Sequence, residues 1–234
     1  MARGRRGPAR RADPPRRPAR RRRRARAVRA GAAALRPAGG AGGGVSGPVV
    51  GADGRARCPW AAGELYERYH DEEWGRPVHG TAPLFERLTL EAFQSGLSWI
   101  TVLRKRPAFR AAFAGFAPEV VAAYGPEDVE RLLGDAGIVR NRAKVEATVA
   151  NARAVLALDV PLDALLWSYA PDPPPPAPRT TADVAATSPA STAMARDLRA
   201  RGFRFVGPTT CHALMQATGM VDEHLAGCWR RSST

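Results

Sequence analysis

Two side chains that bind transition metals lie four positions apart near the C-terminal end of the chain, in the segment DEHLAGCW (222–229). If this segment is helical, His224 and Cys228 share one face and can contact one ion. Two further ligands stand at the ends of CPWAAGELYERYH, which begins with Cys58 and ends with His70. The four residues form a Cys2His2 set, the combination that structural zinc prefers. Because the spacing of the first pair follows no zinc-finger rule, a terminal thiol and a surface histidine remain the alternative.

A metal bound by four protein ligands has no open coordination position, so the ion predicted here is structural and takes no part in hydrolysis. It would join the first and last segments of the folded part and restrict their conformational freedom. The chain has three cysteines, the third being Cys211. This small, odd number is typical of a reducing cytoplasm.

A second group of residues has the composition of a pocket for a cationic aromatic ligand. At 100° per residue, Glu91 lies on the same helical face as Leu84, Leu88 and Ser95, where a carboxylate is costly to bury without a partner. Trp99 follows eight positions later, and four more aromatic residues crowd the preceding segment: Trp60, Tyr66, Tyr69 and Trp74. Electron-rich rings and a carboxylate both attract a positive charge. The alternatives are a glutamate at the rim or paired with an arginine, and aromatic residues that belong to the core.

Helices are expected to position nearly all of these residues. Helical spacing of apolar residues predicts a helix capped by Thr81 and a second apolar run from Trp99 that is interrupted at Pro107. Further helices are predicted over 127–133, 145–156, 191–201 and 210–219, and PDPPPPAP (171–178) predicts a proline-rich loop. No segment alternates with period two for long enough to indicate a sheet. The predicted class is all-α.

The segment AGIVRNRAK (136–144) predicts a hairpin between two of these helices. Gly137 permits a tight turn there, and amides at the start of the next helix can bind a phosphate. Arg140, Arg142 and Lys144 add positive charge, and Arg104–Arg106 form another basic run. Contacts to a nucleic-acid backbone are one interpretation of these runs, and a solvated charged surface is the other.

The positive charge of the chain is concentrated at its N-terminal end. Residues 1–57 contain 17 of the 36 Lys and Arg residues with only two acidic ones, whereas residues 58–234 have 19 basic and 20 acidic residues. The Arg-, Pro- and Gly-rich N-terminal part predicts a disordered extension with weak, non-specific affinity for nucleic acid. An organellar presequence is the alternative, although Pro and Gly argue against an amphipathic helix. Its apolar stretch is too short and too charged for a membrane span. One folded domain is predicted over 58–234.

Six motifs occur in order: CPW, LYERYHDEEWG, LTLEAFQSGLSWITVLRKR, AGIVRNRAKVEATVANA, RGFRFVGPTT and DEHLAGC. Together they resemble the DNA-3-methyladenine glycosylase I family of helix-hairpin-helix DNA glycosylases, over nearly all of 58–234 and none of 1–57. The resemblance implies a helix-hairpin-helix fold in which Cys58, His70, His224 and Cys228 bind one structural zinc. It also implies that Glu91 contacts the flipped base, that Trp99 stacks on it, and that the tyrosines of LYERYH shape the pocket.

The activity implied by the resemblance is hydrolysis of the N-glycosidic bond of 3-methyladenine in double-stranded alkylated DNA, which leaves an abasic site. We expect a monomer that acts at the nucleoid in a bacterial cytoplasm, without a membrane. Asp159 and Asp163 follow the hairpin on ordinary helix-end sequence, so we expect water, and no catalytic aspartate, at the sugar. One rival is a lyase that forms a Schiff base through Lys144. The other is a damage-binding module without turnover.

Overall fold

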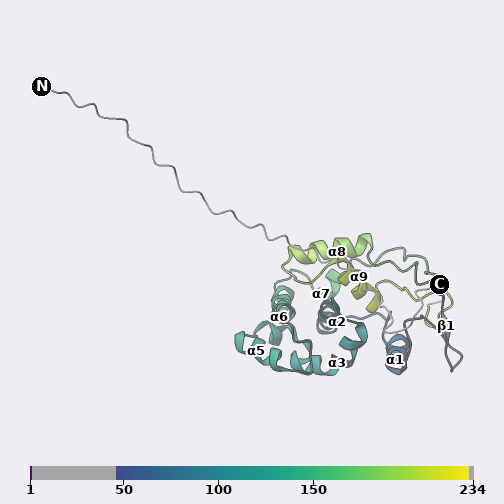
Figure 1. Cartoon of the computed structure of the whole chain (residues 1–234). Helices are drawn as coiled ribbons and strands as arrows, with labels where there is room; N and C mark the ends of the chain where they lie inside the picture. Colours follow the sequence, from purple (N-terminus) through teal and green to yellow (C-terminus); the bar gives the residue numbers. More distant parts are fainter. Residues whose placement is uncertain (2–45, 232–234) are drawn as a thin grey trace.

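The structure is a computed structural model that describes Met1 and residues 46–231. Within this part the chain forms nine α-helices, one short 3-10 helix and one two-stranded antiparallel sheet (Figure 1). The elements are β1 Val49–Val50, β2 Ala56–Arg57, α1 Glu64–Glu72, α2 Thr81–Gln94, α3 Trp99–Ala112, η1 Ala114–Phe116, α4 Pro118–Ala122, α5 Pro126–Gly134, α6 Arg142–Leu156, α7 Leu162–Trp167, α8 Pro189–Ala200 and α9 Pro208–Ala217. The all-α class is confirmed. Among the described residues, no helix combines the length and the apolar character that a membrane crossing requires.

Helix α2 forms the centre of the molecule. Every residue from Leu84 to Gln94 is buried, because α2 packs against α3, α6, α7 and α9 on its different sides. A helix enclosed in this way carries apolar residues around its whole circumference, as Leu84, Phe85, Leu90 and Phe93 do here. Any polar residue in the last turns of α2 is therefore forced into the interior.

Several predicted helix boundaries need correction. Thr81 is the first residue of α2, and the cap position is taken by Gly80, whose φ of 89° favours glycine. Helix α3 continues through Pro107, because Leu103 and Phe109 on either side are buried and their packing offsets the missing amide donor. Helices α8 and α9 each begin two residues earlier than predicted, at a proline that suits the first helical position.

The folded part begins before the boundary predicted at Cys58. Strands β1 and β2 form a hairpin in which Val49 pairs with Arg57, and Ser46 contacts Thr181 through its backbone amide. Arg57 is only 6% exposed and is bonded to Asp71 on α1. Residues 46–57 are thus part of the fold, and the prediction of disorder for residues 2–45 concerns a segment outside the described residues.

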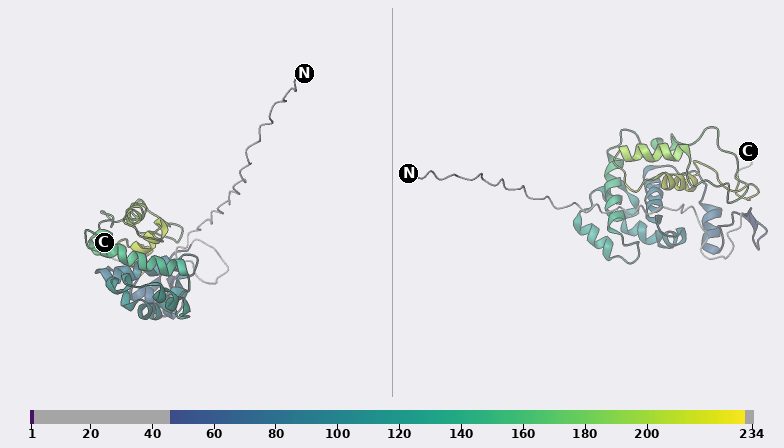
Figure 2. Two further views of the ribbon diagram at one scale, coloured as in Figure 1. Left: turned by 90° about the vertical axis from the view of Figure 1, so that its left-hand side faces the viewer. Right: turned by 45° about the horizontal axis from the view of Figure 1, so that its top comes forward.

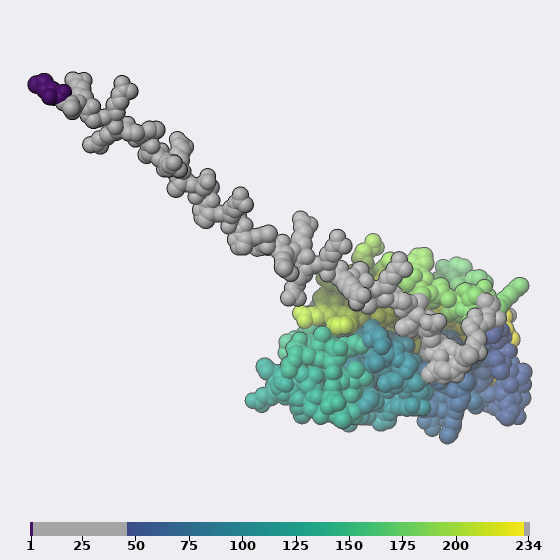
Figure 3. Space-filling view, viewed as in Figure 1, coloured from purple at the N-terminus to yellow at the C-terminus, as the bar shows by residue number. Residues whose placement is uncertain are grey.

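The helices lie in two layers. Helices α8 and α9 pack against each other, and α9 rests on α2, so that the yellow-green segment forms one side of the molecule in Figures 1 and 3. Helix α1 and the β hairpin lie at one end, close to the described C-terminal residues, while α5 and α6 lie at the opposite end (Figures 1 and 2). The predicted metal ligands and the predicted DNA-contacting hairpin are therefore at opposite ends.

Candidate functional site

The structure brings the four predicted metal ligands together. The ligand atoms of Cys58, His70, His224 and Cys228 all lie within 4.8 Å of one another, and all four residues are buried. The Cys228 Sγ lies 3.4 Å from His70 Nε2 and 3.6 Å from His224 Nδ1, while Cys58 Sγ lies 3.9 Å from His224 Nδ1. A tetrahedral ion with zinc bond lengths separates sulfur from nitrogen by about 3.6 Å. This Cys2His2 cluster can therefore hold one metal ion.

Both histidines are oriented by the ring nitrogen that points away from the cluster. His70 Nδ1 lies 2.8 Å from Asp71 Oδ1, and His224 Nε2 lies 3.2 Å from the Trp74 carbonyl oxygen. Such bonds select the tautomer in which the other nitrogen is free to bind a metal. Burial raises the pKa of Asp71, but hydrogen bonds from Arg57, His70 and Trp229 outweigh it and lower the pKa to about 2. Asp71 is thus an ionised acceptor for His70.

The pair at 224 and 228 is brought together by a turn and not by a helix, which corrects the geometry considered above. Residues 222–229 contain no helical segment. Gly227, with φ of 87°, reverses the chain, and the amide of Cys228 donates to the Leu225 carbonyl at 2.8 Å. A second anchor is the bond from the Ala226 amide to the carbonyl of Pro178, at the end of the proline-rich loop.

The two thiols of the cluster shift each other's pKa in opposite directions, and the contact with Cys228, together with burial, raises the pKa of the Cys58 thiol. The hydrogen bond from Cys58 is the largest influence on Cys228 and lowers the pKa of its thiol; burial opposes this, and the bonds to His224 and His70 add to the lowering. All three cysteines are free thiols. Cys211 is buried on α9, where burial raises its pKa to about 12, and it lies outside the cluster of four ligands.

A small cavity lies between α2, α9 and the segments that follow α1 and α2. Its lining includes four of the predicted pocket residues, Glu91, Trp99, Tyr69 and Trp74. Three further residues, Gln94, Ala213 and Gln216, line it as well and were not predicted. Gln216 follows Leu214 and Met215 near the end of α9, and a polar residue beside these buried apolar ones was the signal that sequence analysis missed. The empty volume is about 240 Å³, but the interior has room for at most about one water molecule. A purine enters only if the surrounding side chains move.

Glu91 is buried in the wall of this cavity. Burial raises the pKa of its carboxyl group to about 8, and the positive charge of Arg87, one helical turn earlier, acts in the opposite direction. Arg87 is itself bonded to Glu73 at 2.7 Å and stands over the ring of Tyr69. A neutral carboxyl group near neutral pH becomes ionised when a cation arrives beside it, because the opposite charge favours the ionised form.

The indole of Trp99 supplies an edge of the cavity. Its Nε1 is buried and has no hydrogen-bond partner among the described residues, and its ring lies 5.5 Å from that of Tyr69. Trp99 is the first residue of α3, and Tyr66 fixes this helix end by accepting a hydrogen bond from the Ile100 amide at 2.9 Å.

Two residues predicted for the pocket do not line it. Tyr66 and Trp60 pack behind the lining residues, with their rings 5.8 Å apart. The ring of Trp60 contacts that of Trp74 edge-on, with centroids 5.0 Å apart. Tyr66 lies on α1 and Trp60 precedes it, and their role as base contacts stays a prediction.

The predicted hairpin joins α5 to α6 through residues 135–141. Gly137 donates its amide to Asp135 at 2.7 Å, and a Cβ at this position would come within 2.9 Å of Ala108, so the turn requires glycine. Arg140 is exposed and has no hydrogen bond or ion pair with any described residue. Arg142 is also exposed, but it is bonded to Glu130 at 2.7 Å.

The basic run before the hairpin is largely engaged within the protein. Lys105 donates to the carbonyls of Ala136 and Gly137, and Arg106 forms two bonds of 2.6 Å with Glu73. Within the described part of the chain, Arg104 is the member of this run without such a bond.

Lys144 does not point to the surface, and its predicted contact with DNA is corrected. Its side chain is 7% exposed, and Nζ donates to the carbonyls of Phe93 at 2.8 Å and Ser95 at 2.6 Å. It therefore satisfies carbonyl groups at the C-terminal end of α2, which have no partner within the helix. Burial lowers the pKa of this amine. The lysine joins α6 to the loop between Glu91 and Trp99.

The two aspartates that follow the hairpin form surface contacts. Asp159 is bonded to Arg201 at 2.7 Å, and Asp163 accepts the Gly80 amide and contacts His79. Neither lines the cavity.

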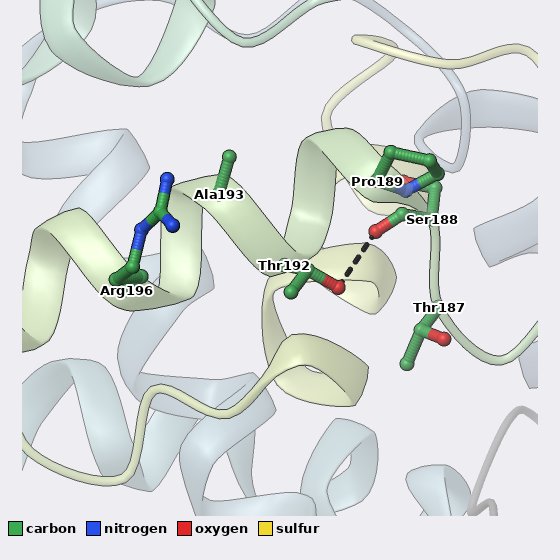
Figure 4. Close-up of a pocket in the computed structure, with 6 residues that line it drawn as sticks. All are labelled: Thr187, Ser188, Pro189, Thr192, Ala193 and Arg196. Atoms are coloured by element: carbon green, nitrogen blue, oxygen red, sulfur yellow. Dashed lines mark hydrogen bonds between the residues drawn. The ribbon is translucent and has the colours of Figure 1, made fainter.

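A further surface hollow at the start of α8 is lined by Ser188, Thr192 and Arg196, among others (Figure 4). There the Thr192 hydroxyl group donates a hydrogen bond to the Ser188 carbonyl at 2.9 Å, within the first turn of α8.

Comparison with known proteins gives a consistent result. The family model for methyladenine glycosylase matches residues 60–231. The chain is 46% identical over 177 residues to DNA-3-methyladenine glycosylase 1 of Escherichia coli K12, covering 74% of this chain and 95% of that protein.

Two solved structures have the same fold. A crystal structure of 3-methyladenine DNA glycosylase I is 44% identical, with a TM-score of 0.72, and the match covers 75% of this chain and all of that one. A single-substitution variant of 3-methyladenine DNA glycosylase I, crystallised in complex with 3-methyladenine, is 33% identical, with a TM-score of 0.69. That match covers 74% of this chain and 95% of the other.

Proposed function

The chain belongs to the methyladenine glycosylase family, and on this premise we propose that it excises 3-methyladenine from alkylated double-stranded DNA. The reaction is hydrolysis of the N-glycosidic bond and leaves an abasic site. The observation that carries the proposal is the placement of Glu91, a buried carboxyl group in a cavity walled by Tyr69, Trp74 and Trp99. Packing alone gives no reason for an acidic group there, because its burial is costly. A cationic aromatic ligand removes that cost.

The chemistry follows from the charge of the damaged base. The glycosidic bond cannot be reached inside a duplex, so the nucleotide is extruded from the stack. Alkylation at N3 gives the nucleoside a positive charge, which makes the base a good leaving group. Ionised Glu91 favours this charge and accepts hydrogen bonds from the base, while Trp99 stacks on it. Water attacks the sugar, and the base leaves with the bonding electrons.

The Cys2His2 cluster is the proposed site of one structural zinc ion. Two thiol and two imidazole ligands whose binding atoms lie within 4.8 Å of one another suit zinc. When bound, the ion joins the segment before α1 to the C-terminal turn. Asp71 and the Trp74 carbonyl orient the two histidines through hydrogen bonds. Trp74 also lines the cavity, so the position of His224 affects the cavity wall.

Binding to DNA is assigned to the α5–α6 hairpin, which we propose to be the helix-hairpin-helix element. Arg140 offers an exposed cation there, at the turn that leads into α6, and such a cation can contact a backbone phosphate. The proposed oligomeric state is a monomer. Since the substrate is chromosomal DNA, the proposed place of action is the bacterial nucleoid.

The decisive experiment incubates the protein with methylated duplex DNA and identifies the released base by chromatography. We expect 3-methyladenine in solution and strand breaks only after alkali treatment. Glu91→Gln, which keeps the shape and removes the charge, should lower the rate about tenfold to hundredfold. Tight binding without release would instead indicate the damage-binding module. A covalent adduct trapped by borohydride would indicate the lyase.

A further inference from the structure

The wall that α9 contributes to the cavity contains one polar side chain, Gln216. It is 4% exposed and lies three positions after Ala213, which lines the same cavity. Its side-chain amide nitrogen donates to Glu223 Oε2, and the other oxygen of Glu223 lies 3.2 Å from His212 Nε2. Because His212 and Gln216 are four residues apart on α9, they face the same way and share this carboxylate.

The shared carboxylate determines which way the glutamine amide faces. A carboxylate accepts hydrogen bonds, so the NH2 group of Gln216 must point to Glu223. The carbonyl oxygen Oε1 then lies on the other side of the planar amide group. No described residue donates a hydrogen bond to it, although the residue is almost fully buried. Gln216 lines the cavity, so an acceptor there that no described residue bonds is available to a ligand that donates to it.

We propose that Gln216 is a specificity-determining residue, whose Oε1 accepts a hydrogen bond from the amino group of the flipped base. Glu223 and His212 are the positioning residues that prevent the amide from turning over. This inference rests on the proposed function, and extends it to the choice between bases. In the same arrangement, a base with a carbonyl group in place of that amino group would bring its oxygen against Gln216 Oε1, and two acceptors repel each other.

Adenine and guanine differ in this respect. Adenine carries an amino donor at position 6, and guanine carries a carbonyl acceptor there. The groups that line the cavity include the acceptors of Glu91 and Gln216 and a donor without a partner among the described residues, Trp99 Nε1. A site with buried polar groups of this kind rejects a ligand that leaves them unpaired. Gln216 should therefore favour 3-methyladenine over 3-methylguanine.

The test measures excision of both bases from the same methylated DNA. Gln216→Met keeps the length of the side chain and removes the acceptor, and Glu223→Gln lets the amide of Gln216 turn over. Each should lower kcat/KM for 3-methyladenine about tenfold to hundredfold and that for 3-methylguanine less than threefold. Metal content should remain that of the unmodified protein. Thr192→Ala on the exposed side of α8 is the control and should change neither rate (Figure 4).

An unchanged ratio of the two rates in the variants would overturn the inference. If both rates fall by the same factor, Gln216 has only a structural role. If the variants do not fold, the unmodified protein provides the answer through the side-chain amide signals of its glutamines in NMR. Free 3-methyladenine should shift the Gln216 signal, and a 6-oxo purine should not; equal responses would also overturn it. A wild-type protein that releases no 3-methyladenine would refute the proposed function instead.

Discussion

His224 and Trp74 connect the metal cluster to the cavity. The imidazole Nε2 of His224 is bonded to the backbone carbonyl of Trp74 at 3.2 Å, and the two rings meet edge to face with centroids 4.6 Å apart. The indole of the same tryptophan lines the cavity beside Glu91. Gly75 makes this contact possible, because a Cβ there would lie 2.9 Å from His224 Nε2. The position of His224 in the metal cluster therefore affects the position of Trp74 in the cavity wall.

Loss of the metal should therefore weaken base binding as well as the fold. We expect one zinc per chain, and we expect Cys228→Ser or His224→Ala to abolish it and to cost several kcal/mol of unfolding free energy. Affinity for free 3-methyladenine, followed by tryptophan fluorescence, should fall with the metal. Cys211→Ala is the control, since that thiol lies outside the cluster and its loss should leave the metal in place. A folded, active protein purified without zinc would contradict the assignment.

Glu91→Gln should change the pH dependence of stability. The pKa of Glu91 is about 8 in the folded protein against an ordinary value of 4.5, so the folded state holds the proton more tightly. Stability is consequently lost as the pH rises from about 4.5 to about 8. The glutamine variant lacks this loss, and its advantage in unfolding free energy should grow by up to a few kcal/mol between pH 5 and pH 8.5. Urea unfolding of both proteins at the two pH values measures this difference in unfolding free energy. The same difference between variant and wild type at both pH values would refute the prediction.

The same carboxyl group should determine the pH profile of the reaction. Ionised Glu91 favours the cationic base, so kcat/KM of the wild type should rise from pH 6 to about pH 8. In Glu91→Gln this rise should disappear, and the rate should be lower throughout. A rise that persists in the variant would assign it to another group.

Tyr66→Phe should impair excision through the position of Trp99. The substitution removes the acceptor of the Ile100 amide in the first turn of α3, at a cost of about 1–3 kcal/mol, and should lower kcat about tenfold. Tyr124→Phe is a matched control, because Tyr124 donates to the Ala112 carbonyl at the other end of α3. It should lower stability to a similar extent and leave kcat unchanged. Equal effects of both variants on kcat would show that the loss is only one of stability.

Lys144→Met should destabilise the loop that connects Glu91 to Trp99. The carbonyls of Phe93 and Ser95 lose their donor, so stability should fall by about 1–3 kcal/mol and excision should slow. Lys105→Met is the control, since Lys105 also donates to two carbonyls, but in the hairpin. It should weaken DNA binding and spare the pocket. Borohydride should trap no adduct with either protein, and an adduct that requires Lys144 would contradict its structural role.

Removal of residues 1–45 and of residues 1–57 should have different consequences. The longer deletion removes Arg57, which holds Asp71 and through it His70, and also removes the β hairpin beside the C-terminal turn. Its product should bind zinc less tightly and unfold at a lower temperature. The shorter deletion should preserve both properties and reduce only salt-sensitive DNA binding. Equal metal affinity of the two proteins would place the boundary back at Cys58.

Residue type and helical periodicity were sufficient for much of this protein. Thiols and imidazoles bind zinc, so residue type offered Cys58, His70, His224 and Cys228 as one possible ligand set, and the resemblance to a known family selected it. The 3.6-residue spacing of apolar residues placed Glu91 on an inward face and predicted the all-α class, because both are local properties of the chain.

Only the tertiary structure decided where long polar side chains point. Lys144 looked like a surface cation, yet its amine caps α2 about fifty residues earlier in the chain. Trp60 and Tyr66 do not line the small cavity, whereas Gln216 lines it and is bonded to Glu223. His224 and Cys228 meet through a turn at Gly227 and not along a helix. Each of these outcomes depends on a contact between segments distant in sequence, and such contacts arise from packing that no local pattern records.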